Sequence, residues 1–346
     1  MKDIEQPTVI STFAGCGGSS LGYKMAGFRE LLAVEWDDNA VETFKLNFPD
    51  VPVYHGDIAK LTGGECMKLA GGIKPGELDV LDGSPPCQGF STAGKRKWDD
   101  PRNSLFKEYA RLLAELQPKC FVMENVTGMV KGHMKQAYLQ IIATLRACGY
   151  KAKGEVLNAM YYGVPQSRQR VIIIGVRNDL GIEPTHPKPQ TKPIPLKVAL
   201  DGCPVGEFKY LEGPRAAIIG KVKPGESMQK YANGNYFNTI RLDPDAPSPT
   251  IPKLFGSSWG SFFARWDSDR SISINEAKRI ASFPDEYKFI GKFEEQWSRI
   301  GNSVPPLLMK AIAEHIRKAI LMPLSCARTA CGASVIAATC LAKAGA

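Results

Sequence analysis

Several features that would define a metalloprotein, a membrane protein or a secreted protein are missing from this 346-residue sequence. It contains nine cysteines and four histidines but no Cys-x-x-Cys pair and no cluster of the two, so it predicts neither a zinc site nor a disulfide framework. No apolar run approaches the roughly 20 residues of a membrane-spanning helix. The first seven residues lack the apolar core of a secretory signal. Unpaired thiols fit a reducing compartment, so we expect a cytoplasmic protein with no metal and no membrane partner.

Positive charge, in contrast, is in excess. Lysine and arginine number 44 against 35 acidic residues, a formal net charge of +9, which favours an anionic partner without saying which. Charge kept only for solubility is the alternative. Apolar residues make up 44% of the chain, as in ordinary globular proteins. The length allows one large domain and a smaller one.

Residues 8–20 have the pattern of a strand, a glycine-rich turn and the start of a helix. This layout brings a ligand close to the backbone amides at a helix N-terminus. Glu35 closes the next apolar run, 20 residues after Gly15, where a nucleotide-binding fold places the acid that binds ribose hydroxyls. The pattern alone suggests a nicotinamide-dinucleotide enzyme, although Ser20 stands where the third glycine or alanine of that fingerprint belongs.

A cysteine follows directly on a predicted strand in residues 83–91 (GSPPCQGFS). Residues 78–82 form the short apolar run of a buried strand, and a basic segment comes after the cysteine. Pro85 and Pro86 restrict the backbone before Cys87, which suits a nucleophile that must be aimed. A small buried cysteine is the alternative, because free cysteines are usually buried.

A glutamate ends the strand that is predicted at residues 120–123. In an open parallel sheet, ligand-facing residues gather at the carboxyl ends of the strands, which places Glu124 and Cys87 at one edge. A carboxylic acid there can act as a general acid that assists a nucleophile. The alternative is a strand-end glutamate that caps a helix.

Two arginines lie two positions apart in residues 166–170 (QSRQR), directly before the apolar run of residues 171–175. In an extended segment Arg168 and Arg170 share a face. Two guanidinium groups on one face suit a carbonyl oxygen and a nearby phosphate. An ordinary charged edge before a core strand is the alternative.

Taken in order, four motifs resemble those of DNA (cytosine-5) methyltransferases of the prokaryotic or phage modification type. They are SPPCQGFS (84–91), ENV (124–126), QSRQR (166–170) and GNSVP (301–305). The resemblance implies an α/β fold, with the doubly wound, mostly parallel, Rossmann-like sheet of S-adenosylmethionine-dependent methyltransferases and a second, smaller loop-rich β domain. It implies a restriction–modification enzyme that transfers a methyl group from S-adenosylmethionine to C5 of a cytosine flipped out of a specific double-stranded DNA sequence.

The same resemblance assigns catalytic roles to four residues. Cys87 would bond covalently to C6 of the cytosine, and Glu124 and Arg170 would bind the ring. Arg168 would support a phosphate and the active-site loop. The loop after Cys87, up to residue 100, would close over the flipped base.

A further set of residues would bind the cofactor by resemblance. These are Phe13, Ala14, Gly15, Gly17, Glu35, Trp36, Asp57, Ile58, Pro85, Asn302 and Ser303. Glu35 would hold the ribose, and Trp36 would pack on the adenine. Asp57 would contact the adenine amino group, unless it only caps a turn. Asn302 and Ser303 would line the methionine end.

The composition changes after residue 180, where prolines recur and helical periodicity fades. We expect a discontinuous catalytic domain of residues 1–180 and 259–321, a target-recognition domain of residues 181–258, and a flexible tail of residues 322–346. The residues expected to contact DNA are Gln88, Ser91, Lys95, Arg96, Tyr236 and Arg241. We expect the protein to bind double-stranded DNA as a monomer.

Two other functions stay open from the sequence. The NAD-dependent oxidoreductase rests only on the glycine turn and Glu35, and it leaves residues 84–91 and 166–170 without a role. A DNA-binding protein that has lost catalysis would fit the charge. Every expected catalytic position is filled, however, which argues against it.

Overall fold

The computed structural model describes residues 6–86, 104–130, 135–234, 236–256 and 261–325. Its centre is a seven-stranded sheet with the order β3-β2-β1-β4-β5-β8-β6. Only β8 runs antiparallel to its neighbours in this sheet, β5 and β6. The strands are β1 (Thr8–Thr12), β2 (Arg29–Glu35), β3 (Val53–His55), β4 (Val80–Gly83), β5 (Cys120–Val126), β6 (Tyr150–Asn158) and β8 (Gln169–Arg177). The predicted α/β fold with a mostly parallel sheet is confirmed.

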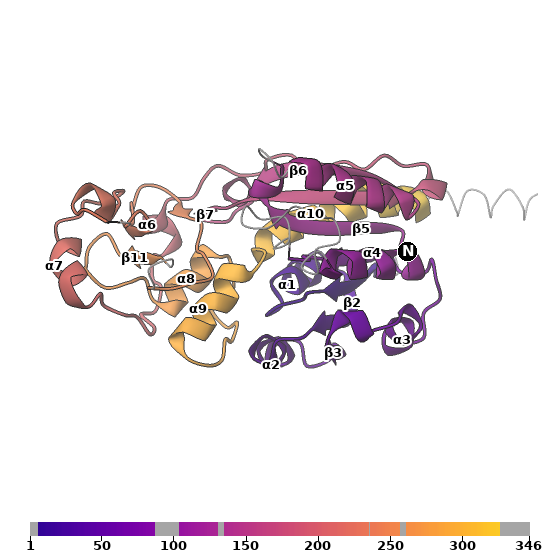
Figure 1. Cartoon of the computed structure of the whole chain (residues 1–346), viewed down its shortest axis with the longest axis horizontal. Coiled ribbons are helices and arrows are strands. Elements are labelled where there is room, and N and C mark those ends of the chain that lie inside the picture. The colour runs from indigo at the N-terminus through magenta and orange to yellow at the C-terminus, as the bar shows by residue number, and fades with distance from the viewer. Residues whose placement is uncertain (1–5, 87–103, 131–134, 235, 257–260, 326–346) are drawn as a thin grey trace, which may run out of the picture.

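Helices cover both faces of this sheet, because the central strands carry apolar side chains on both sides. α1 (Gly18–Met25) and α10 (Pro306–Ile316) pack against one face, and a π-helical turn (Arg317–Leu321) continues α10. α4 (Ser104–Leu116) and α5 (Lys135–Ala147) pack against the other (Figure 1). Two shorter helices, α2 (Asp38–Asn47) and α3 (Gly63–Leu69), precede and follow β3 in the chain.

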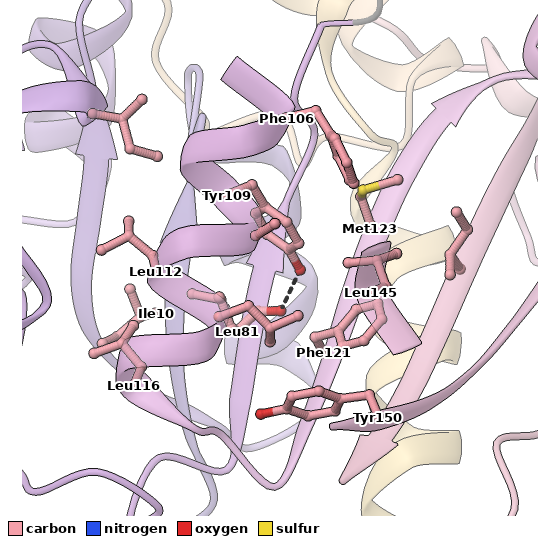
Figure 2. Close-up of a cluster of buried hydrophobic side chains, with 14 of the residues drawn as sticks. Ile10, Leu81, Phe106, Tyr109, Leu112, Leu116, Phe121, Met123, Leu145 and Tyr150 are labelled. Carbon is pink, nitrogen blue, oxygen red and sulfur yellow. Dashed lines mark hydrogen bonds between the residues drawn. The ribbon is translucent and has the colours of Figure 1, made fainter. Parts of the chain in front are cut away.

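Figure 2 shows the core beneath α4. Apolar side chains recur along this helix every three to four residues, so one stripe faces the sheet. The buried members are Phe106, Tyr109, Leu112, Leu113 and Leu116. The hydroxyl of Tyr109 lies 3.3 Å from the carbonyl oxygen of Leu81 and 3.2 Å from that of Val122. A polar atom in the core therefore keeps a hydrogen-bond acceptor within reach.

α10 returns the C-terminal part of the chain to the first helix. A Cβ added at Gly22 of α1 would lie 2.6 Å from Cβ of Met309 and 2.6 Å from the carbonyl oxygen of Pro306. Only glycine permits this close approach of two helices. The motif before α10, residues 301–305, is thereby brought back to the turn before α1.

The remaining strands and α-helices lie at one end of the long axis of the molecule, and the seven-stranded sheet lies at the opposite end (Figure 1). They are β7 (Gln166–Ser167), α6 (Leu196–Ala199), α7 (Ala216–Ile219), β9 (Thr239–Arg241), β10 (Ser248–Pro249), β11 (Phe262–Ala264), α8 (Ile274–Ile280) and α9 (Phe293–Asn302). A small core of its own holds part of this region. It comprises Leu211, Ile219, Val222, Met228, Phe262 and Ala264.

Contacts cross the predicted boundaries at residues 181 and 258, which stay predictions. β11 lies beyond residue 258, yet it pairs with β9 in parallel. His186 lies after residue 181, yet its ring nitrogen is 2.9 Å from the carbonyl oxygen of Ile172 in the central sheet. Composition marks where regular helices cease, which is not where the packing changes.

α8 begins as its sequence predicts. The Ser273 hydroxyl accepts a hydrogen bond from the Glu276 amide, and the Glu276 carboxylate accepts one from the Ser273 amide. This reciprocal cap satisfies two amides that a helix start leaves open. Across the described ranges, no helix is long and apolar enough to cross a bilayer.

Candidate active site

The carboxyl ends of β1, β2, β4 and β5 meet along one edge of the sheet. The glycine turn follows β1, Glu35 ends β2, Pro85 follows β4, and Glu124 lies near the end of β5. Because β1 lies between β2 and β4, and β4 lies beside β5, these groups are close in space although distant in sequence. The order of the strands changes direction at β1 and β4, which is where open α/β sheets bind ligands.

The turn after β1 adopts backbone conformations that favour glycine. Gly15 has φ 56° and Gly17 has φ 93°, and Phe13 adopts φ 54° despite its side chain. A Cβ at Gly17 would lie 2.5 Å from the ring of Phe48 and 2.8 Å from the hydroxyl of Tyr287. The glycine at residue 17 is therefore required both by conformation and by space.

Glu35 locks this turn through its carboxylate. One oxygen accepts a hydrogen bond from the amide of Gly15 at 2.8 Å, and the other accepts from the amides of Trp36 (2.9 Å) and Asp37 (3.0 Å). Glu35 is only 8% exposed, so its carboxylate is largely enclosed by the turn that it locks. The indole of Trp36 is 76% exposed and presents an open face beside it. The roles of both residues toward a ribose and an adenine stay predictions.

Asp57 caps the short 3-10 helix Ile58–Lys60 by accepting a hydrogen bond from the Ala59 amide at 3.0 Å. The capping alternative for Asp57 is thus observed, and its contact to an adenine stays a prediction. Ile58 itself is buried beside it, as is Ala14 in the glycine turn.

The C-terminal motif reaches the glycine turn. The Ser303 hydroxyl donates to the carbonyl oxygen of Arg299 at 2.8 Å and lies 3.0 Å from the sulfur of Cys16. Burial raises the pKa of the Cys16 thiol to about 11, so this thiol is neutral and is not a nucleophile. Asn302, the last residue of α9, is exposed. Ser303 therefore lies beside the glycine turn, and the roles of Asn302 and Ser303 toward the cofactor stay predictions.

Glu124 and Arg170, which are predicted to bind the cytosine, form an ion pair across β5 and β8. Nε of Arg170 lies 2.8 Å from a carboxylate oxygen of Glu124, and the two side chains are 14% and 12% exposed. The antiparallel register places Arg170 opposite Val126, two residues beyond Glu124. The sequence predicts both residues but not their direct contact.

Asn125 joins this strand to the segment that leads into Cys87. Its side-chain amide donates to the carbonyl oxygen of Pro85 at 3.0 Å, in a buried position. The backbone that enters residue 87 is therefore fixed beside Glu124. Sequence reasoning quoted this asparagine within a motif and gave it no role. The signal available in the sequence was an asparagine directly after the glutamate that ends the predicted strand.

Arg168 is placed differently from Arg170. Its side chain is 3% exposed, and its guanidinium donates to the carbonyl oxygens of Ile251 at 3.2 Å and Gly301 at 2.9 Å. The prediction that Arg168 supports a phosphate is at odds with this geometry, because both terminal nitrogens are directed into the protein. An extended strand does alternate its side chains, but β7 ends at Ser167 and β8 begins at Gln169, so the strict alternation is broken between the two arginines.

Arg241 is also placed inside the protein, at 6% exposed. It donates to the carbonyl oxygens of Val222 at 2.6 Å and Ile219 at 2.7 Å, and it pairs with Asp269. The contact of Arg241 to DNA stays a prediction, and in this structure its donors bind groups within the small region instead. Tyr236 is half-buried, and its ring packs against that core.

Cys87, Gln88, Ser91, Lys95 and Arg96 lie outside the described residues. Their roles stay predictions. Within the described ranges, no group of three or more His, Cys, Asp or Glu side chains is placed to hold a metal ion.

Two buried carboxyl groups lie beneath the edge, and sequence reasoning missed both. Burial and the nearby Glu30 carboxyl raise the pKa of Asp82 to about 8, and burial raises the pKa of Glu30 to about 7. The Tyr23 hydroxyl donates to Asp82 at 3.3 Å, and the Ser20 hydroxyl donates to Glu30 at 2.9 Å. A carboxyl inside an apolar strand was the only signal in the sequence.

Comparison with known proteins agrees with this arrangement. The family model for C-5 cytosine-specific DNA methylases matches residues 7–318. The chain is 36% identical to the Type II methyltransferase M1.HphI of Haemophilus parahaemolyticus, over 90% of this chain and 87% of that one. It is also 36% identical to M.DdeI of Desulfomicrobium norvegicum, over 89% of this chain and 88% of that one.

Solved structures share the fold. A protein described as a DNA modification methyltransferase from an E. coli prophage superposes with a TM-score of 0.74 at 25% identity, covering 91% of this chain and 99% of that one. A DNMT2 of Spodoptera frugiperda superposes with a TM-score of 0.66 at 20% identity, covering 90% and 99%. The motifs, the sheet order and the family match together show that the chain belongs to the C-5 cytosine-specific DNA methylases.

Proposed function

We propose that this DNA cytosine-5 methyltransferase draws a target cytosine out of double-stranded DNA and methylates it while Cys87 is covalently bonded to C6. The observation that carries the proposal is the Glu124–Arg170 ion pair. Glu124 lies near the end of β5, which pairs with β4, the strand that leads into Cys87. The Asn125–Pro85 hydrogen bond keeps these two strand ends together. The NAD-dependent alternative falls with the family assignment.

Glu124 and Arg170 are the groups that would bind the extruded ring. The carboxyl of Glu124 can hydrogen-bond N3 and the exocyclic amine of cytosine, and the guanidinium of Arg170 can hydrogen-bond O2. Because the two side chains already pair at 2.8 Å, each orients the other before a base arrives. Such preorganisation lowers the reorganisation that the reaction step would otherwise require.

The chemistry of the base needs both an acid and a nucleophile. Cytosine C5 is a weak nucleophile. C6 becomes electrophilic when Glu124, after its carboxylate takes up a proton from solvent, gives that proton to N3. The Cys87 thiolate then adds to C6, which turns C5 into an enamine-like carbon that accepts the methyl group. Water removes the C5 proton, the bond between sulfur and C6 breaks to release the Cys87 thiolate, and N3 returns its proton to Glu124.

Membership of the family implies S-adenosylmethionine as the cofactor, which supplies the methyl group from its sulfonium. The residues present fit it. The glycine turn leads into the N-terminus of α1, and its Gly17 and Gly18 lie too close to neighbouring residues to carry a Cβ. Glu35 would bind the ribose hydroxyls, and Trp36 offers a 76% exposed ring for the adenine. Ser303 would line the methionine end.

The duplex must be opened for this reaction, because C6 of a stacked cytosine cannot be reached. Extruding one base costs a few kcal/mol, which contacts to the surrounding DNA offset. The net charge of +9 supplies general affinity for phosphates. Residues in the small region around β9 and β11 would read the target sequence.

The test is a duplex with 5-fluorocytosine at the target position, found first by bisulfite sequencing of DNA from cells that express the protein. Fluorine cannot leave as the C5 proton does, so the covalent complex should persist on a denaturing gel with wild type and be absent with Cys87→Ala. No adduct with wild type, or the same adduct with Cys87→Ala, would refute the covalent step. An adduct that forms with Cys87→Ala but not with wild type would also contradict this mechanism.

A further inference from the structure

Arg168 lies where three distant parts of the chain meet. It follows β7 and precedes β8, the strand that carries Arg170. Its guanidinium bridges the carbonyl oxygen of Ile251, 83 residues away, and that of Gly301, 133 residues away. Ile251 lies where the chain returns from the small region around β9 and β11, which we call the recognition region. Gly301 directly precedes residues 302–303, which we call the cofactor-side motif.

The returning segment, residues 248–252, is held on one side by β7. β10 pairs with β7 in parallel, with Ser248 opposite Gln166. The Gln166 side chain accepts a hydrogen bond from the Ile251 amide at 3.2 Å. The Thr250 hydroxyl donates to the carbonyl oxygen of Ser167 at 2.9 Å. The segment thus makes contacts to β7 beyond the pairing of β10.

α9 holds the same segment on its other side. The Trp297 indole donates to the carbonyl oxygen of Pro252 at 3.0 Å. A Cβ at Gly301 would lie 2.3 Å from that same oxygen, so the helix and the segment touch backbone to backbone. Arg168 spans both contacts, since it reaches residue 251 with one nitrogen and residue 301 with the other.

The guanidinium of Arg168 is buried without a carboxylate partner. Among the described residues no acidic group lies within ion-pair distance of it, and its Nε has no hydrogen-bond partner. Burial lowers the pKa of Arg168 to about 9, which still leaves the side chain charged at neutral pH. A buried cation is costly, so its two carbonyl contacts do more than fill space. A lysine ammonium lacks the planar fork that spans two acceptors.

We propose that Arg168 is a positioning residue that sets the recognition region against the base-binding and cofactor-side motifs, and is not a phosphate ligand. The inference rests on the proposed function and extends it. It assigns to one side chain the alignment of three sites: the strand with Arg170, the exit of the recognition region, and residues 302–303. Substituting Arg168 should therefore disturb how DNA is read, while the groups that act on the base stay in place.

The test compares Arg168→Lys with Arg177→Lys, a matched change at the other end of β8. Arg168→Lys should raise KM for DNA at least about tenfold and increase methylation at sites that differ by one base pair, because small displacements of a positioned group cost large factors. Arg177→Lys should do neither. A second pair, Thr250→Val at the junction and Thr185→Val outside it, keeps the test available if Arg168→Lys does not fold.

The salt dependence of DNA binding separates the two roles of Arg168. Loss of a phosphate contact reduces the slope of log K against log[salt] by about 0.9. We expect Arg168→Gln and Thr250→Val to weaken binding with the wild-type slope. A reduced slope for Arg168→Gln would restore the phosphate role and overturn the inference.

A purely structural role is also distinguishable. If Arg168→Lys and Thr250→Val lower Tm but leave KM for DNA and site fidelity as in wild type, the positioning role is refuted. Failure of the wild type to form the 5-fluorocytosine adduct would instead refute the proposed covalent mechanism. The two failures therefore appear in different measurements.

Discussion

The candidate site has two halves. After β1 and β2, the conformation and the amides of the backbone determine its shape, whereas between β5 and β8 contacts of side chains determine it. The glycine turn is locked by amides that donate to the Glu35 carboxylate, and its conformation depends on positive φ angles. The other half depends on the Glu124–Arg170 ion pair and on the Asn125 side chain. We call the glycine turn with Glu35 the cofactor half, and Glu124, Asn125 and Arg170 the base half. Substitutions in the cofactor half should lower the stability of the fold, whereas substitutions in the base half should lower the rate of methyl transfer.

The largest effect should follow a change in the base half. Glu124→Gln keeps the shape of the side chain but removes the proton donor, so kcat should fall by about 10²–10⁴ while cofactor affinity stays within twofold of wild type. Single-turnover methylation and calorimetric titration of S-adenosylmethionine measure the two. The matched control is Glu108→Gln, which breaks a partly buried Glu–Arg pair on α4. A kcat within threefold of wild type would contradict the role of Glu124.

A change in the cofactor half should have a smaller effect, on the free energy of unfolding instead of on kcat. Gly17→Ala must adopt φ 93° and place a Cβ 2.5 Å from Phe48. We expect about 3 kcal/mol of lost stability together with weaker cofactor binding. Urea unfolding measures the stability. Gly64→Ala, in α3 with nothing within 4 Å of its added Cβ, should be neutral or slightly stabilising, and a similar loss there would defeat the explanation.

The buried carboxyls beneath both halves should make the smallest effect, visible as pH dependence. The pKa of Glu30 is raised to about 7 and that of Asp82 to about 8, so the folded state holds protons that the unfolded state releases. Their contribution to stability is complete below about pH 4 and is lost as pH rises through 7 and 8. Glu30→Gln and Asp82→Asn should therefore become more stable relative to wild type between pH 5 and 9, by about 2 kcal/mol.

Tm measured across this pH range tests the prediction. Groups that face the two carboxyls include Tyr23, Tyr109 and Glu124, and they do not change between wild type and variants. Because the Glu30 carboxyl also raises the pKa of Asp82, the comparison reports on the two carboxyls as a coupled pair. A constant difference in Tm from pH 5 to 9 would show that neither carboxyl changes its protonation there.

The motif residues were predictable because their positions follow a local rule. Each of Glu35 and Glu124 lies at or near the carboxyl end of an apolar run, and a parallel sheet brings such ends together. Arg170 was predictable because it opens the next apolar run. The capping box of α8 was predictable because both partners lie within four residues.

Arg168 and Arg241, which the sequence places near DNA, show the limit of this reasoning. A guanidinium that faces DNA and one that faces backbone carbonyls look the same in a sequence. Arg168 finds its acceptors 83 and 133 residues away, and Arg241 finds Asp269 across a turn of the small region. No local pattern encodes acceptors at those separations.

By itself the sequence determined the α/β class, the family and the order of the motifs, and it predicted the acid and the arginine that we propose bind the base. These depend on residue types and on spacing along one strand or turn, where neighbours in the chain are neighbours in space. Tertiary structure alone decided that Glu124 pairs with Arg170, that Arg168 and Arg241 turn inward, and that Glu30 and Asp82 lie buried near each other. Such contacts depend on which distant segments pack together, because burial and hydrogen-bond partners are properties of the assembled core.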